Sequence, residues 1–254
     1  MNNLTYYKEK LKKLNNDLNK IHKLAARNKL YRKYNSILNI PLHENHIKYY
    51  NPKHVRKLQC SGKIPNNLEK LINLECLTIC CASKIESKLP ISLKKIVFFN
   101  CKITDFKFLE NLYNLEKLFI INNKKSNISD CKLPISIIEF CCNKCEITDF
   151  KFLEDLYNLK KLYISGNKNS NISHCNLPIK LTELECSYCN ILDFKFLKNL
   201  YNLKKLFITG NNNSNISNCE LPFKLIKFVC INCNITDFNF LKSSNNLRII
   251  TISN

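Results

Sequence analysis

The stretches LTELECSYCNILDFKFLKNLYN (181–202) and LKKLFITGNNNSNISNCELPFK (203–224) follow each other directly and place apolar residues at the same positions. Each begins with an apolar residue, two variable residues, and then two apolar residues separated by one. The same 44-residue period, now counted from each Leu-Pro dipeptide, gives the units 89–132, 133–176 and 177–220. A shortened copy follows from residue 221. These two nested periods indicate a repeat architecture, in which each unit packs against its neighbours.

The LxxLxLxx part of each half predicts a short β-strand. Successive side chains of a strand point to opposite faces, so the leucines face a core and the residues between them face outward. Parallel stacking of one strand per repeat then buries a continuous apolar column. An aspartate precedes each FxFL segment, and we expect it to cap a helical turn on the opposite side of the repeat. These residues are Asp105, Asp149, Asp193 and Asp237.

The halves resemble leucine-rich repeats, whose signature is LxxLxLxx(N/C)xL. The matching residues are Leu203, Leu206, Ile208 and Asn211 in one half, and Leu181, Leu184, Cys186, Cys189 and Ile191 in the other. The LPxxL halves are similar to bacterial-type and FNIP repeats, and the Asn-rich composition is similar to that of a giant virus or an AT-rich protist. The resemblance covers residues 55–254, roughly nine repeats and a partial last one. It implies an α/β leucine-rich repeat solenoid, with a curved parallel β-sheet on the concave face and short helices or turns on the convex face.

Three CxxC pairs leave zinc binding, redox chemistry and core packing as alternatives; they are Cys142–Cys145, Cys186–Cys189 and Cys230–Cys233. Parallel strands lie about 4.8 Å apart, so equivalent cysteines two repeats apart are separated by about 10 Å. A disulfide needs Cα atoms within about 7 Å, and tetrahedral zinc needs four ligands where one repeat offers two. We therefore expect reduced thiols that pack as small apolar side chains, with no metal and no disulfide.

The second cysteine of each pair belongs to a longer column in which cysteine and asparagine alternate from one half-repeat to the next. The resemblance implies that this column is a structural ladder, whose side chains satisfy backbone groups of neighbouring repeats. Its members are Cys101, Asn123, Cys145, Asn167, Cys189, Asn211 and Cys233.

The chain is strongly basic, with 40 Lys and Arg against 20 Asp and Glu in 254 residues. A formal net charge of +20 favours acidic proteins, nucleic acid or an anionic surface as partners. The first residues hold no apolar signal-peptide core, and no apolar run approaches the roughly 18 residues of a membrane span. We therefore expect a cytoplasmic, reducing location (host cytoplasm if the chain is viral) and no membrane partner.

Residues 1–54 carry 12 basic and 3 acidic side chains, and apolar residues recur at helical spacing over 1–35. We expect a basic α-helical segment that caps the open end of a repeat domain over 55–254, because terminal repeats need a different outer face. A short coiled coil for a partner and a nucleic-acid-binding segment are alternatives.

No phosphate-cradling glycine motif, HExxH motif or nucleophile elbow occurs, so we expect no catalytic residues, no metal site and no cofactor. We expect a non-catalytic scaffold that binds another, acidic protein on its concave face, because exposed aromatics interleaved with cations are typical of interfaces. The predicted site consists of Phe119, Tyr163, Phe207, Lys160, Lys161, Lys204 and Lys205. Alternatives are a basic nucleic-acid-binding solenoid and a substrate-recognition adaptor of a ubiquitin ligase. An uncovered last strand also predicts a homodimer through the C-terminal edge.

Overall fold

The protein forms one parallel β-sheet in which the strands follow each other in sequence order. The computed structural model describes residues 42–43, 52–62, 64–235, 237–242 and 244–253. Its 11-stranded sheet runs in the order β1 to β11. The strands are β1 (Leu42–His43), β2 (Lys57–Ser61), β3 (Cys76–Cys80), β4 (Lys95–Phe99), β5 (Lys117–Ile121), β6 (Glu139–Cys141), β7 (Lys161–Tyr163), β8 (Glu183–Glu185), β9 (Lys205–Phe207), β10 (Lys227–Ile231) and β11 (Ile249–Ser253).

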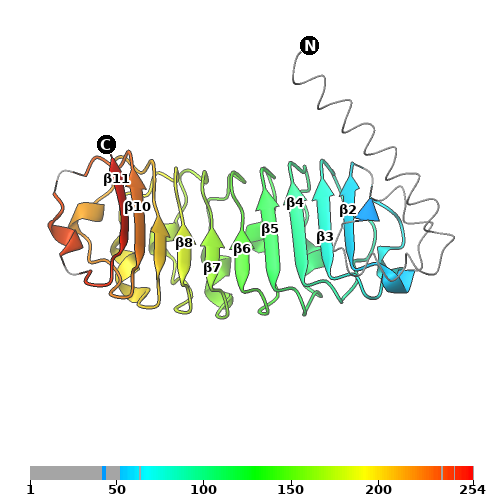
Figure 1. Cartoon of the computed structure of the whole chain (residues 1–254). Coiled ribbons are helices and arrows are strands. Elements are labelled where there is room, and N and C mark those ends of the chain that lie inside the picture. The colour runs from blue at the N-terminus through cyan, green and yellow to red at the C-terminus, as the bar shows by residue number, and fades with distance from the viewer. Residues whose placement is uncertain (1–41, 44–51, 63, 236, 243, 254) are drawn as a thin grey trace, which may run out of the picture.

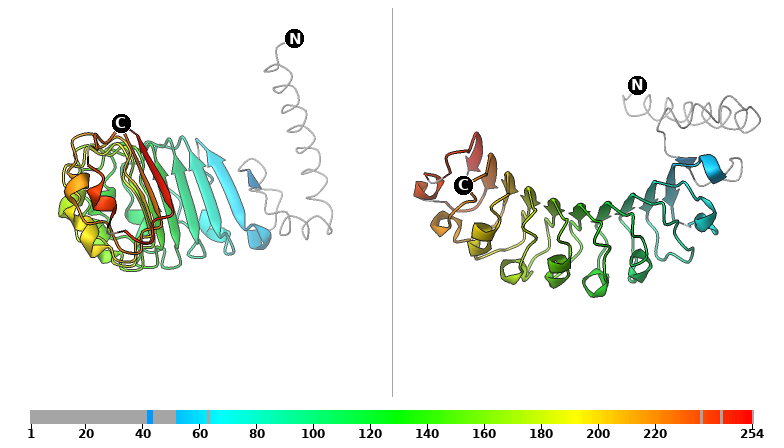
Figure 2. Two further views of the ribbon diagram at one scale, coloured as in Figure 1. Left: turned by 60° about the vertical axis from the view of Figure 1, so that its left-hand side comes forward. Right: turned by 90° about the horizontal axis from the view of Figure 1, so that it is seen from below.

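Short 3₁₀ helices cover the side of the repeats opposite the strands. Figure 2 (right) shows an arc with the strands along its inner side and the helical turns along its outer side. The 3₁₀ helices are η2 (Pro52–His54), η3 (Leu68–Lys70), η4 (Lys107–Leu109), η5 (Ile128–Asp130), η6 (Lys151–Asp155), η7 (Ile172–His174), η8 (Lys195–Asn199), η9 (Ile216–Asn218) and η10 (Asn239–Leu241). The predicted solenoid, with a concave sheet and short helices or turns outside it, is confirmed (Figure 1).

The core lies between the sheet and the helical turns. Leu206 of β9 and Ile208, directly after this strand, point inward and are fully buried, and Phe194 of the outer side packs into the same core. Phenylalanine rings meet edge to face across it, with centroids 5.3 Å apart for Phe98 and Phe106. Burying one such side chain contributes roughly 1.5–3 kcal/mol, and because every repeat places apolar side chains at its inward positions, the core is continuous along the solenoid.

The four predicted aspartates bond to the helical turns, but from the position before the N-cap, which is a phenylalanine in each of these helices. Asp149 accepts a hydrogen bond from the backbone N–H of Lys151 at 2.9 Å, and Asp105, Asp193 and Asp237 make the corresponding bond. Asn171, an N-x-S sequon residue, donates its amide to Asp149 and accepts the backbone N–H of Phe150. This asparagine column therefore holds each helical turn against the next repeat.

The two parts of the predicted domain division differ in how much of them the structure describes. The expected helix over 1–35 lies outside the described residues, as do residues 44–51. Strand β1, from the predicted N-terminal segment, pairs in parallel with β2 through Leu42↔Leu58 and His43↔Gln59. The sheet thus begins before residue 55, where the sequence predicts the first repeat.

Candidate functional site

The centre of the concave face is a column of outward side chains in strict register. Neighbouring strands align Phe119 with Cys141, Cys141 with Tyr163, Tyr163 with Glu185, and Glu185 with Phe207. The predicted aromatics Phe119, Tyr163 and Phe207 therefore share one column and alternate with other side chains. All three rings are partly buried, and Cys141 between the first two is only 4% exposed although it faces outward.

A second column, two residues earlier in each strand, alternates in charge. It runs Lys117, Glu139, Lys161, Glu183 and Lys205. Lys117 Nζ lies 2.9 Å from Glu139, and Lys205 Nζ lies 3.2 Å from Glu183. The side chains of Glu139 and Glu183 are only 14% and 15% exposed, so most of each side chain is shielded from solvent.

The sequence predicts a cationic border but misses these glutamates. Lys161 and Lys205 lie in the mixed-charge column, whereas Lys160 and Lys204, one residue earlier in the chain, are exposed. The alternation of Lys and Glu at one repeat position along the printed sequence is the signal that could have revealed the column.

The aromatic side chains are held in place by polar and cationic neighbours. The Tyr163 hydroxyl donates a hydrogen bond to Glu183 Oε1 at 3.1 Å. Burial, together with the negative charge of Glu183, raises the pKa of Tyr163, so the phenol stays protonated and keeps donating. Lys95 Nζ lies 5.0 Å from the centre of the Phe119 ring, and Lys227 Nζ lies 5.2 Å from that of Phe207, both within cation–π range.

The cysteine and asparagine column lies inside the solenoid. Buried Asn167 accepts the backbone N–H groups of Cys145 and Ile147, and it donates to the carbonyls of Cys142 and Ile164. Asn123 and Asn211 are also fully buried and bond to backbone of the preceding repeat. The thiols of Cys145 and Cys189 donate to the carbonyls of residues 120 and 164 at 3.1 and 3.2 Å, and Cys101 makes longer contacts of the same kind.

Burial keeps these thiols in their neutral form. It raises the pKa of Cys145 to about 12 and that of Cys189 to about 11, and it raises those of Cys142 and Cys186 well above the ordinary value. The thiolate is the form that binds metals and attacks electrophiles. Within the described ranges, no three His, Cys, Asp or Glu side chains gather closely enough to hold a metal ion.

The expectation that the chain contains no disulfide stays a prediction for one pair, whose sulfur atoms lie side by side. This pair is Cys230 and Cys233, the last member of the predicted ladder, with Cα atoms 6.1 Å apart. The distance argument compared cysteines of different repeats, whereas the two residues of one CxxC turn lie within the Cα separation that a disulfide allows. Cys142–Cys145 and Cys186–Cys189 are thiols.

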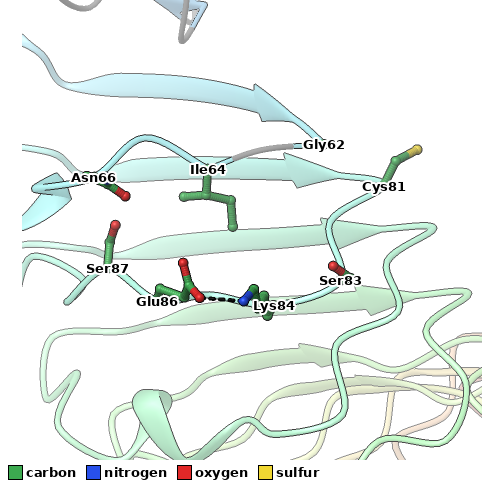
Figure 3. Close-up of a pocket in the computed structure, with 8 residues that line it drawn as sticks. All are labelled: Gly62, Ile64, Asn66, Cys81, Ser83, Lys84, Glu86 and Ser87. Atoms are coloured by element: carbon green, nitrogen blue, oxygen red, sulfur yellow. Dashed lines mark ion pairs between the residues drawn. The ribbon is translucent and has the colours of Figure 1, made fainter.

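A hollow of about 440 Å³ opens between the irregular loops that follow β2 and β3. Figure 3 shows its lining, with Asn66 and Ser87 on one side and the Lys84–Glu86 ion pair along another. Cys81 belongs to the lining but its side chain points away from the others. The exposed Lys84–Glu86 pair and the two small polar side chains form no nucleophile–base arrangement.

Comparison with known proteins finds likeness in structure alone. No protein-family model matches the sequence, and no curated protein matches it. The structure is similar to internalin C2 of Listeria monocytogenes, with a TM-score of 0.59, 25% identity, and 80% of this chain and 82% of that chain covered. An internalin (inlF) of the same organism gives a TM-score of 0.60 at 21% identity, with 80% of this chain and 63% of that chain covered. The leucine-rich repeat domain of the type III effector XopL gives 0.58 at 18% identity, covering 77% of this chain and 75% of that one.

The fold of these neighbours agrees with the sequence and structural features of this chain. The repeat signature, the buried Asn and Cys positions and the 11-stranded parallel sheet are the features of one architecture. No helix in the described part of the chain is long and apolar enough to cross a membrane. The chain is a leucine-rich repeat solenoid, a repeat scaffold of a kind commonly used in protein–protein interaction.

Proposed function

We propose that the protein is a non-catalytic scaffold that binds another protein through the centre of its concave face. The observation that carries this proposal is the column of partly buried aromatic rings, held by hydrogen-bonded and cationic neighbours on a rigid sheet. Preorganised aromatic side chains favour binding because little conformational freedom is lost when the partner arrives.

Tyr163 is the proposed centre of the interface. It lies between buried Cys141 and partly buried Glu185 in the column, and its hydroxyl is fixed on Glu183. Aromatic residues near the middle of an interface commonly lose about 2 kcal/mol or more of binding free energy on truncation. We therefore expect Tyr163→Ala to weaken binding about 30-fold or more.

Charge selects the partner and its orientation. The alternating Lys–Glu column offers charges of both signs at a spacing of about 4.8 Å per repeat, so a partner with matching alternate charges fits it. Exposed Lys160 and Lys204 make the border cationic and suit an acidic partner. Border charges act mainly on the association rate, so Lys160→Ala with Lys204→Ala should weaken binding chiefly at low salt.

The test begins with capture of the partner from cells of the source organism, followed by binding measurements with the purified partner. Tyr157→Ala is the matched control, because Tyr157 is another tyrosine of the same repeat but lies in the loop before β7. We expect Tyr163→Ala to lose binding while Tyr157→Ala keeps it. The opposite pattern would contradict the concave site, and salt-sensitive retention on DNA or RNA in place of a protein would favour the nucleic-acid alternative. Capture of ubiquitin-ligase subunits would indicate the adaptor role.

A further inference from the structure

A row of exposed apolar side chains runs along one edge of the solenoid. In eight consecutive repeats, the residue four positions before the strand is a large apolar one whose side chain is exposed. We call this set the entry rim; it consists of Ile72, Ile91, Tyr113, Ile135, Tyr157, Ile179, Tyr201 and Phe223. Their exposed fractions are 50–70%, and they account for eight of the fourteen exposed large apolar residues among those that the structure describes.

The entry rim is continuous and flat enough to meet a surface. Figure 1 shows the loops that precede the strands along the lower edge at similar heights, and Figure 2 (right) shows that this edge curves as an arc when seen from below. Neighbouring strands are about 4.8 Å apart, so successive rim residues lie close enough to form one apolar strip. Half of a large side chain exposes roughly 100 Å², so eight of them exceed the few hundred Å² that soluble monomers commonly expose in one patch.

The rim loops are tied to each other and cannot easily fold inward. Asn114, directly after Tyr113, donates its amide to the carbonyl of Ile91 at 2.9 Å. Asn158 and Asn202 make the same bond from the later repeats, to the carbonyls of residues 135 and 179. Each of these bonds ties the loop of a rim tyrosine to the backbone of the rim isoleucine one repeat earlier, so hydrogen bonds hold neighbouring parts of the apolar strip together.

Cations stand beside the rim in its second half. Lys180 and Lys224 directly follow two rim residues, and their amino groups donate to the side chains of Asn158 and Asn202 at 2.8 and 2.9 Å. Lys160 and Lys204 are exposed three residues after Tyr157 and Tyr201. Mixed apolar, tyrosine and lysine side chains are the composition that binds the interface of an anionic bilayer, where apolar parts enter the acyl boundary and cations meet the head groups.

The charge argues against two other occupants. Docked rim to rim, a second copy of this chain would set Lys180 and Lys224 against their own equivalents, and the chain's own residues 1–54 would bring a net charge of +9 against the rim lysines. The arc shape disfavours a straight helix, because a straight rod cannot follow a curved strip along its length. We infer that the entry rim is a docking surface for a flat anionic lipid membrane, on which the solenoid stands on this edge without spanning it. This departs from the sequence-based expectation of no membrane partner, which rested on the lack of a spanning apolar run and does not bear on peripheral docking.

Tryptophan fluorescence tests this inference, because the chain contains no Trp. The full-length variants Tyr157→Trp and Tyr163→Trp each carry a single tryptophan, one on the rim and one on the concave face, which is excited selectively over the remaining tyrosines. The probe is a vesicle of phosphatidylcholine and anionic phosphatidylserine, mixed at about two to one. With these vesicles, we expect the emission of Tyr157→Trp to shift to shorter wavelength and to be quenched by lipids brominated on their acyl chains. The emission of Tyr163→Trp should not change.

A second measurement separates apolar docking from general attraction of a basic protein. Tyr157→Ser with Ile179→Ser keeps the charge of the chain, and we expect about tenfold or greater weakening of co-sedimentation with the same vesicles. An unchanged thermal unfolding transition will show that the variant is folded. Three outcomes would overturn the inference: no vesicle binding by the parent chain, binding that survives the double substitution, or loss of protein-partner binding in the double variant with vesicle binding intact. Because partner binding is assigned to Tyr163, failure here leaves the concave site untouched.

Discussion

Asn167→Ala is the perturbation that tests the internal ladder most sharply. The side chain is fully buried and takes part in four hydrogen bonds of 2.7–3.1 Å, two as acceptor and two as donor. Alanine leaves the backbone N–H groups of Cys145 and Ile147 without this acceptor, and each buried unsatisfied donor costs about 1–3 kcal/mol. The expected loss is about 4 kcal/mol, a large part of the roughly 5–15 kcal/mol that stabilises a typical protein.

Two assays report this change, one for the stability of the whole domain and one for individual backbone amides. Urea unfolding followed by circular dichroism should give a clearly lower midpoint, because the loss applies to the folded state. Hydrogen–deuterium exchange should show faster exchange at Cys145 and Ile147, with strands several repeats away little affected, because each repeat contacts only its neighbours. Asn176→Ala, at an exposed position of the next turn, is the control and should lie within about 0.5 kcal/mol of the parent. Unchanged exchange at both amides together with an unchanged midpoint would refute the reasoning.

Two other properties follow from the structure. Gly210→Ala should lower the unfolding midpoint, because φ is +72° there and a Cβ would lie 2.4 Å from the Tyr188 ring. Gly62→Ala should lower the midpoint less, because φ is +76° there but a Cβ would have nothing within 4 Å. Equal decreases in the two midpoints would refute the role of the ring contact. At pH 8, iodoacetamide should modify exposed Cys81 at least about 100-fold faster than Cys145, because the pKa of Cys145, raised to about 12, leaves very little of its thiolate. Mass spectrometry of the folded protein measures both rates, and comparable rates would contradict the burial of Cys145.

Periodicity made the architecture predictable from the sequence. A regular period with LxxLxL fixes which residues face inward, so a single register places Leu206 and Ile208 in the core and Phe207 on the concave face. The hydrogen bonds of Asp149 and its equivalents were predictable for the same reason, because a short polar residue before each FxFL segment has a nearby backbone donor to bind.

Features that depend on contacts between repeats were harder to predict. Glu183 pairs with Lys205 of the next strand, one repeat further along the chain. Identifying the lysines in the sequence does not reveal this ion pair. The close approach of Cys230 to Cys233 depends on local turn geometry, and the sequence does not distinguish this CxxC pair from the other two. The entry rim, for example Tyr157, was missed because exposure before a strand depends on how the loops stack, which the hydrophobic pattern does not encode.

Site-specific photo-crosslinking is the most direct test of concave-face binding. The photoreactive residue p-benzoylphenylalanine would replace Tyr163, Phe207 or the exposed Phe238 before η10, one at a time, and the purified partner would be added before irradiation. We expect covalent adducts from the two concave positions and none from Phe238. Adducts from Phe238 alone would place the partner on the convex side and contradict the proposal.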